Sequence, residues 1–194
     1  MPKIAAIVLA AGLSRRFGAN KLLQEFRGKP LIRHVVESAQ ASTAGTVVVV
    51  TGAESHAVKA VLADTKVELV DNIDFSTGLS SSLIQGLKSV PPDCAGALIL
   101  LGDMPLVSAE IIDQLIEMFS PTSSRAIGVP LSQGRQGNPV LWGRQFFPEL
   151  LALSGDRGAK ALITAHQDWV YTLEVGDPAV HIDIDTPDDL HRYE

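Results

Sequence analysis

Residues 3–21 read KIAAIVLAAGLSRRFGANK, an apolar run of strand length that passes directly into a loop of small and basic residues. The apolar run predicts a buried strand, because parallel strands covered on both faces read as continuous apolar segments. The loop carries three cations within seven residues, namely Arg15, Arg16 and Lys21. Gly12 lets a ligand approach the backbone, and free amides beside cations suit phosphate oxygens. The stretch therefore predicts a strand followed by a nucleotide triphosphate site.

A plain strand-to-helix turn with solvated basic side chains is the alternative, since glycine-containing connections are common in α/β proteins. The whole chain has a net charge of −6, from 16 Lys and Arg against 22 Asp and Glu, so the three clustered cations are a local exception. The acidic balance argues against a protein that binds nucleic acid or membrane surfaces. We favour the ligand-binding interpretation.

Length and composition predict one domain over residues 1–194, since 194 residues with 46% hydrophobic content can bury a full core. Residues 1–12 are too short an apolar segment for a signal peptide or a membrane span. We therefore expect a cytoplasmic protein. Cys94 is the only cysteine, which excludes an internal disulfide and a cysteine-cluster metal site.

Strand-like and helix-like segments alternate along the chain. Runs rich in Val, Ile and Leu predict strands at 5–9, 46–51, 67–70, 97–101 and 126–129. Helical spacing marks 30–41, 55–62, 79–88 and 108–119. This order implies an α/β fold, a three-layer α/β/α Rossmann-like sandwich with a mostly parallel sheet. Ligands bind such sheets beyond the carboxyl ends of the strands, so we expect the loops there to converge.

The later third is less regular. We expect strands at 139–142, 170–174 and 181–184, and helices at 143–153 and 158–165. These elements are expected to form a lobe that covers the site. Trp142 and Trp169 could stack on a flat ring of a ligand or fill the core. We favour the core for both, because large aromatic side chains usually contribute packing area.

Acidic residues follow two of the predicted strands. Asp103 comes just after an apolar strand, where a carboxylate can bind Mg2+ with help from phosphate oxygens. A cap of the following turn is the alternative for Asp103. Asp183 and Asp185 have strand spacing and so point to the same side, and one of them could complete a metal site. Residues 186–189 predict a helix start whose two acids compensate the helix dipole.

Residues 71–82 combine side-chain donors with a flexible glycine before a helix, which suits recognition of a ribose or a base. A serine-rich helix start that only caps the helix is the alternative. Segments 137–139 and 155–160 read as turns that either belong to the site or are structural.

Together these motifs resemble the MobA-like nucleotidyltransferases, and within them the branch of the molybdenum cofactor cytidylyltransferases. The resemblance spans nearly the whole chain. Its most specific part is the phosphate-binding signature at 9–22, and counterparts occur at 102–105, 137–140, 155–159 and 183–187. Phe17 replaces the usual methionine, an apolar exchange that affects only local packing.

The resemblance implies a fold of the nucleotidyltransferase (glycosyltransferase-A-like) type. It also implies a Mg2+-dependent transferase that moves CMP from CTP to the terminal phosphate of molybdopterin, forming molybdopterin cytosine dinucleotide and pyrophosphate. A molybdoenzyme is a candidate recipient of the product. Ala11 stands where the guanylyl-transferring branch usually has Gly, which favours CTP over GTP.

The motifs and the resemblance together predict a set of site residues. The catalytic residues are Arg16, Lys21 and Asp103, and the metal ligands are Asp103 with Asp183 or Asp185. The nucleotide-binding residues are Leu9, Ala10, Ala11, Gly12, Ser14, Arg15, Lys21, Asn72, Gly78, Ser80, Ser81 and Gly102. The acceptor-side residues are Asn138 and Asp156.

Three other functions remain open from the sequence. They are a GTP-using guanylyltransferase, a nucleotidyltransferase for another small phosphate, and a non-catalytic carrier of molybdenum cofactor.

Overall fold

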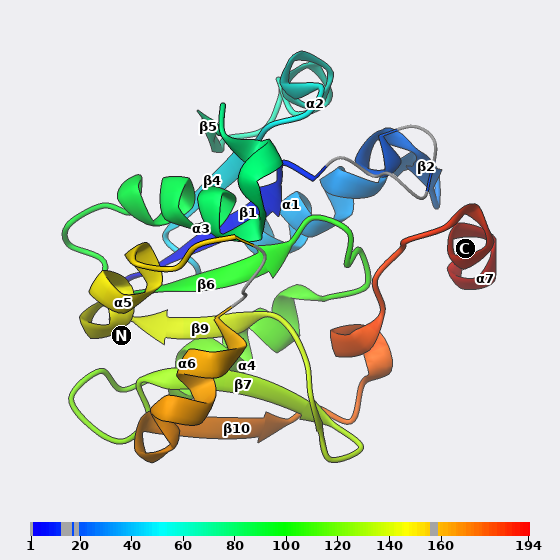
Figure 1. Ribbon diagram of the computed structural model, residues 1–194. Coiled ribbons are helices and arrows are strands. Elements are labelled where there is room, and N and C mark those ends of the chain that lie inside the picture. The colour runs from blue at the N-terminus through cyan, green and yellow to red at the C-terminus, as the bar shows by residue number, and fades with distance from the viewer. Residues whose placement is uncertain (1, 13–16, 18–19, 156–158) are drawn as a thin grey trace.

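The computed structural model describes residues 2–12, 17, 20–155 and 159–194. The main strands are β1 (Ile4–Ala10), β4 (Thr46–Thr51), β5 (Glu68–Asp71), β6 (Gly96–Leu101), β7 (Ile127–Ser132), β8 (Arg135–Gln136), β9 (Val140–Gly143) and β10 (Val170–Glu174). They form an 8-stranded sheet in the order β10-β7-β9-β6-β1-β4-β5, with β8 paired to β7 (Figure 1). A separate two-stranded sheet pairs β2 (Glu25–Phe26) with β3 (Lys29–Pro30).

The sheet is mostly parallel. β1 pairs in parallel with β4 and β6, β4 with β5, and β7 with β10, whereas β9 is antiparallel to both β6 and β7. β1 is buried along its whole length, as its unbroken apolar sequence predicts. The predicted α/β class with a mostly parallel sheet is confirmed.

Helices cover both faces of the sheet, with α3, α5 and α6 on one side and α1 and α4 on the other (Figure 1). The α-helices are α1 (Leu31–Ala41), α2 (Ser55–Val61), α3 (Leu79–Lys88), α4 (Ala109–Met118), α5 (Phe147–Leu151), α6 (Lys160–Ala165) and α7 (Pro187–Tyr193). Short 3-10 helices are η1 (Lys21–Leu23), η2 (Phe75–Thr77), η3 (Arg144–Phe146), η4 (Gln167–Trp169) and η5 (Pro178–His181). Within the described part of the chain, no helix has the length and apolar character that a membrane crossing requires.

Helix α3 packs unusually close to the centre of the sheet. A Cβ added at Gly86 would lie 2.5 Å from Ile7 Cγ2 in β1 and 3.1 Å from Val50 Cγ2 in β4. Both neighbours are completely buried, so neither can move away without disturbing the core. The missing side chain at Gly86 therefore sets the distance between α3 and the sheet.

The later third differs from the sequence prediction. β9 and β10 join the main sheet, because the apolar β9 is inserted between β6 and β7, so no separate covering lobe forms. The predicted strand 181–184 is wrong: Asp177 caps the 3-10 helix η5, which ends at His181, and among the described residues no strand pairs with the segment after it.

Two further expectations for this third need correction. The predicted helix 143–153 is shorter, because Gly143 ends β9 and only η3 and α5 follow. Trp142 is buried at 1% exposure as expected, but Trp169 is 37% exposed and lies at the surface.

Two hydrogen-bonded contacts hold the segment before α7. The backbone amide of Ile184, a fully buried residue, donates to the carbonyl oxygen of Asp103 over 2.9 Å. A capping box then starts α7: Asp189 N donates to Thr186 Oγ1 (3.2 Å), and Asp189 Oδ2 accepts from the amides of Thr186 (2.9 Å) and Asp185 (3.3 Å). These bonds bring the C-terminal segment to the loop after β6.

We expect Gly86→Ala to lower the free energy of unfolding by about 1–3 kcal/mol, because the added methyl group overpacks the contact with Ile7 and Val50. Urea unfolding followed by circular dichroism measures the change. Lys88→Ala, at an exposed position of the same helix, is the control and should change stability by no more than about 0.5 kcal/mol. Equal stability of the two variants would contradict the tight packing.

We expect Asp189→Ala to cost about 1 kcal/mol through loss of the capping box, whereas Asp188→Ala, the adjacent exposed acid, costs little. Hydrogen bonds from Thr186 lower the pKa of Asp189 from its usual 3.8. Its contribution is therefore present above pH 3.8 and is lost as the pH falls through the lowered value. Urea titrations of both variants at neutral and acidic pH test this, and a gap that does not shrink in acid would contradict it.

Candidate active site

Three charged side chains from distant parts of the chain meet beyond the carboxyl ends of β1 and β6. Lys21 Nζ donates to Asp103 Oδ2 over 2.7 Å and to Asp185 Oδ1 over 2.6 Å, across 82 and 164 residues of sequence. The exposed fractions of the three side chains are 12% for Lys21, 24% for Asp103 and 36% for Asp185. The ion pairs are therefore partly shielded from water.

Local structure explains why these side chains converge. Lys21 opens η1, whose N-cap is the buried Asn20. Asp103 follows β6 through Gly102, whose amide donates to the carbonyl oxygen of Leu9 over 3.0 Å. A Cβ at Gly102 would lie 2.9 Å from that same oxygen, so a side chain there would push the loop away from β1. Gly102 thus allows the loop to pack closely against the backbone of Leu9. Its contact with a nucleotide stays a prediction.

The electrostatics of the cluster keep Lys21 charged. Burial by itself lowers the pKa of Lys21, but the adjacent carboxylates of Asp103 and Asp185 outweigh it and raise the pKa above its usual value. Partial burial raises the pKa of Asp183, and the negative charges of Asp185 and Asp103 add to that shift. The charges of the cluster thus affect the pKa of Asp183, whereas Asp185 and Asp103 are both ion-paired with Lys21.

The two paired carboxylates suit a hard divalent cation. Their oxygen atoms converge on one cationic atom, Lys21 Nζ, and carboxylate oxygens are the ligands that such cations prefer. Among the described residues, no group of three or more His, Cys, Asp or Glu side chains is arranged to hold a metal. Mg2+ needs only one or two protein carboxylates when phosphate oxygens and water supply the other ligands. Asp103 and Asp185 therefore fit an ion that binds together with a nucleotide.

Asn72 organises the loop between β5 and α3. It is 1% exposed, and its Nδ2 donates to Ser81 Oγ over 2.8 Å and to Ser82 Oγ over 3.0 Å. Its Oδ1 accepts from the amide of Asp74 over 3.0 Å. The side-chain amide of Asn72 thus holds the loop against the first turn of α3. Direct contact of Asn72 or Ser81 with a nucleotide stays a prediction.

The other polar groups at the start of α3 also make internal contacts. Ser80 Oγ donates to the carbonyl oxygen of Gly155 over 2.7 Å, and the Ser80 amide donates to the same oxygen over 3.2 Å. Gly78 has φ 118°, a backbone conformation that side chains disfavour. These contacts position the loop and tie it to the segment that precedes α6. Whether Gly78 and Ser80 touch a nucleotide stays a prediction.

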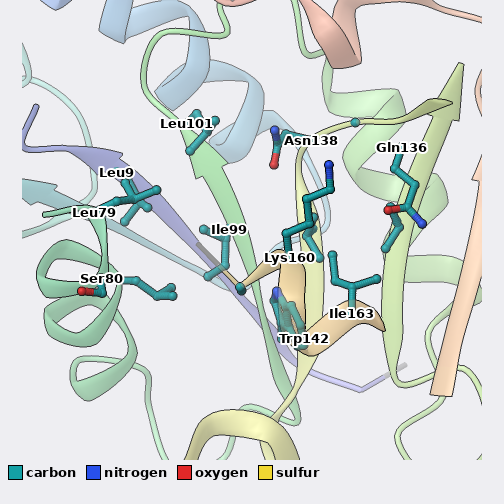
Figure 2. Close-up of a pocket in the computed structure, with 15 residues that line it drawn as sticks. Leu9, Leu79, Ser80, Ile99, Leu101, Gln136, Asn138, Trp142, Lys160 and Ile163 are labelled. Carbon is teal, nitrogen blue, oxygen red and sulfur yellow. The ribbon is translucent and has the colours of Figure 1, made fainter. Parts of the chain in front are cut away.

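An apolar cavity of about 290 Å³ lies between α3 and α6 (Figure 2), and its lining includes Leu101, two positions before Asp103. Leu9, Ile99 and Trp142 contribute apolar surface to its wall. Asn138 and Lys160 add polar groups, and Figure 2 shows the Lys160 side chain extending toward Asn138. The cavity can therefore take a mainly apolar ligand that carries a few polar or anionic groups.

The structure assembles some of the predicted site residues. It joins Lys21 and Asp103 to Asp185, and it places Leu9 and Asn138 on the cavity wall. Ala10 ends β1, Ala11 is buried, and no atom of the described residues lies within 4 Å of the place where a Cβ at Gly12 would be. The predictions for Ser14, Arg15, Arg16 and Asp156 fall outside the described residues.

Sequence reasoning missed several residues that shape the site. Trp142 was expected in the core in preference to a ligand contact, yet it lines the cavity together with Lys160 and Ile163. Lys160 belongs to the segment 155–160, which the sequence left open between a site role and a structural role. The signal for Asp189 was the Thr-Pro-Asp-Asp helix start. The Asp189 carboxylate, part of the capping box, also accepts a hydrogen bond from the backbone amide of Asp185.

Comparison with curated proteins gives several relatives. Over 119 residues the chain is 37% identical to the bifunctional protein GlmU of Francisella philomiragia, covering 60% of this chain and 26% of that protein. It is 28% identical to nicotine blue oxidoreductase of Paenarthrobacter nicotinovorans, covering 99% and 97%. It is 37% identical to a probable molybdenum cofactor guanylyltransferase of Pyrococcus horikoshii, covering 61% and 57%. The chain thus spans about a quarter of the length of the GlmU relative.

Solved structures and a family model agree with the fold. Rv0371c of Mycobacterium tuberculosis superposes with a TM-score of 0.87 at 29% identity, covering 98% of this chain and 97% of that one. The same protein has been solved in complex with manganese, and that structure superposes with a TM-score of 0.84. The model of the MobA-like NTP transferase domain matches residues 6–169, a span that holds Lys21, Asp103 and the cavity wall. This chain therefore belongs to the family of MobA-like NTP transferase domains.

Proposed function

We propose that this protein is a Mg2+-dependent nucleotidyltransferase that moves CMP from CTP to the terminal phosphate of molybdopterin, giving molybdopterin cytosine dinucleotide and pyrophosphate. The observation that carries the proposal is the convergence of Lys21, Asp103 and Asp185. The family match and the guanylyltransferase relative support nucleotidyl transfer.

The reaction asks for charge neutralisation more than for a base. An oxygen of the acceptor phosphate forms a bond to the α-phosphorus of CTP, and the bond between that phosphorus and the pyrophosphate oxygen breaks. The acceptor phosphate is already ionised near neutral pH, so the difficulty lies in bringing anions together. Asp103 and Asp185 would hold Mg2+, which withdraws charge from phosphate oxygens when bound.

Cationic side chains complete the proposed phosphate site. Lys21 stands at the cluster and would neutralise charge on the α-phosphate. Arg16 and the amides of the loop after β1 would hold the remaining phosphates. Asp185 is our choice for the second metal ligand, because Asp185 and not Asp183 shares a cation with Asp103.

The cavity suits the acceptor. Flat heterocycles bind well against apolar walls, which Leu9, Ile99 and Trp142 provide here. The Asn138 amide can pair with polar edge groups of such a ring, and the Lys160 ammonium can attract an anionic group. Ala11, buried at the end of β1 where the guanylyl-transferring branch has Gly, supports CTP as the donor.

The experiment that tests this function is pyrophosphate release with Mg2+, molybdenum-loaded molybdopterin and each of CTP, GTP, ATP and UTP in turn. We expect release with CTP alone. Release with GTP alone would replace the cytidylyl assignment by the guanylyl one. Nucleotide binding without release for any of the four would favour another acceptor phosphate or a carrier of the cofactor.

We expect Asp103→Asn to lower turnover at least about 100-fold, because the neutral amide no longer binds the metal that offsets phosphate charge. Asp93→Asn is the matched control: this surface acid pairs with Lys3 over 2.8 Å and should leave turnover unchanged. Steady-state kinetics with CTP compares both variants. A carrier without catalysis would instead deliver cofactor equally well with either substitution.

The full-length similarity to nicotine blue oxidoreductase favours one further candidate, an oxidoreductase. An oxidoreductase would transfer electrons from a donor to an acceptor without releasing pyrophosphate. Adding NADH or NADPH to the same nucleotide panel, with a dye as electron acceptor, separates the two activities by absorbance.

A further inference from the structure

The position of Lys21 raises a problem for metal binding. Its ammonium lies within hydrogen-bond distance of Asp103 Oδ2 and Asp185 Oδ1, which belong to the two carboxylates that the proposed function assigns to the metal. At 12% exposure, the Lys21 side chain is also the most enclosed of the three. A positive charge of the protein itself therefore stands where the divalent cation is needed.

We infer that Lys21 is an internal counter-ion that a divalent cation must displace, so that the metal site stays closed until Lys21 moves to the phosphates of a bound nucleotide. This inference rests on the proposed function, since it takes Asp103 and Asp185 as the metal ligands. It adds that metal and nucleotide depend on each other through one side chain.

Charge and space both argue that the two cations exclude each other. The carboxylate oxygens come from separate segments, the loop after β6 and the segment before α7, and they converge on a single atom. A divalent ion that takes both oxygens needs the point that Nζ occupies. An ammonium left beside it would be repelled, and partial burial weakens the screening of that repulsion by water.

Lys21 is built to move while its backbone stays in place. The buried Asn20 caps η1 through a hydrogen bond from the amide of Leu22 to Asn20 Oδ1 over 3.1 Å, so the start of η1 is anchored. The lysine side chain is a flexible four-carbon stem that carries a point charge and can pair with phosphate oxygens as well as with carboxylates. A nucleotide that accepts the displaced ammonium lowers the cost of metal binding, and by linkage the metal favours the nucleotide equally.

The first test is Mn2+ binding to the full-length, nucleotide-free protein, measured by calorimetry or by electron paramagnetic resonance. We expect Lys21→Met to bind Mn2+ at least about tenfold more tightly than the unchanged protein, because the ammonium that is bonded to Asp103 Oδ2 and Asp185 Oδ1 is removed. Lys21→Arg keeps the charge between the two carboxylates and should stay weak. Lys3→Met removes an equal charge from the surface pair with Asp93 and should change nothing. Equal Mn2+ affinity in Lys21→Met and the unchanged protein would overturn the inference.

The site of the gain is checked in the double variant Lys21→Met with Asp103→Asn. We expect it to lose the added Mn2+ affinity. If the double variant keeps that affinity, the ion binds elsewhere and the inference fails.

A second measurement needs no substitution and so does not depend on how well the variants fold. An amine-acylating reagent is added to the unchanged protein at increasing Mn2+, and the modification rate of each lysine is read by mass spectrometry. Lys21 should be protected without metal and should react several-fold faster at saturating Mn2+, while Lys3, at 45% exposure, should react at a constant rate. An unchanged rate at Lys21 would overturn the inference.

These readouts separate the inference from the proposed function. Tighter Mn2+ binding by Lys21→Met together with no pyrophosphate release from any nucleotide would keep the displacement of Lys21 and reject the transferase. Pyrophosphate release together with equal Mn2+ affinity in Lys21→Met and the unchanged protein would keep the transferase and reject the displacement of Lys21.

Discussion

The ammonium of Lys21, shared between the carboxylates of Asp103 and Asp185, is the interaction on which the candidate site depends. Three segments far apart in sequence have to reach one point. The parallel pairing of β1 with β6 brings the loops that follow them to the same edge of the sheet. The third segment arrives through the bond from the Ile184 amide to the carbonyl oxygen of Asp103.

The cluster offers charged groups to a ligand, and the cavity between α3 and α6 offers mainly apolar contacts. Partly buried ion pairs cost desolvation energy and are seldom arranged for stability alone, and such groups gather at functional sites. Here the paired charges stand at the open edge of the sheet, while Trp142 and its apolar neighbours line the space between α3 and α6.

The elements that depend on nearby residues could be predicted from the sequence, whereas those that depend on pairing with distant residues could not. β1, β4 and β6, and the helices between them, follow from apolar runs and helical spacing, and they appear within a few residues of the expected bounds. Residues 181–184 alternate like a strand, yet Asp177 and Pro178 favour a 3-10 turn before them, and among the described residues no neighbouring strand is paired with them. The prediction of a covering lobe did not anticipate that β9 lies between β6 and β7 in the main sheet.

By itself, the sequence determined the α/β class, and it singled out the basic segment after β1 and the candidate acids, because each depends on residues adjacent in the chain. Tertiary structure alone decided that Asp185 rather than Asp183 pairs with Lys21, that Asn72 holds the loop before α3, and that a cavity opens between α3 and α6. Those outcomes depend on contacts between residues that lie from 9 to 164 positions apart. The direction and packing of such side chains are set by the assembled sheet and not by local sequence.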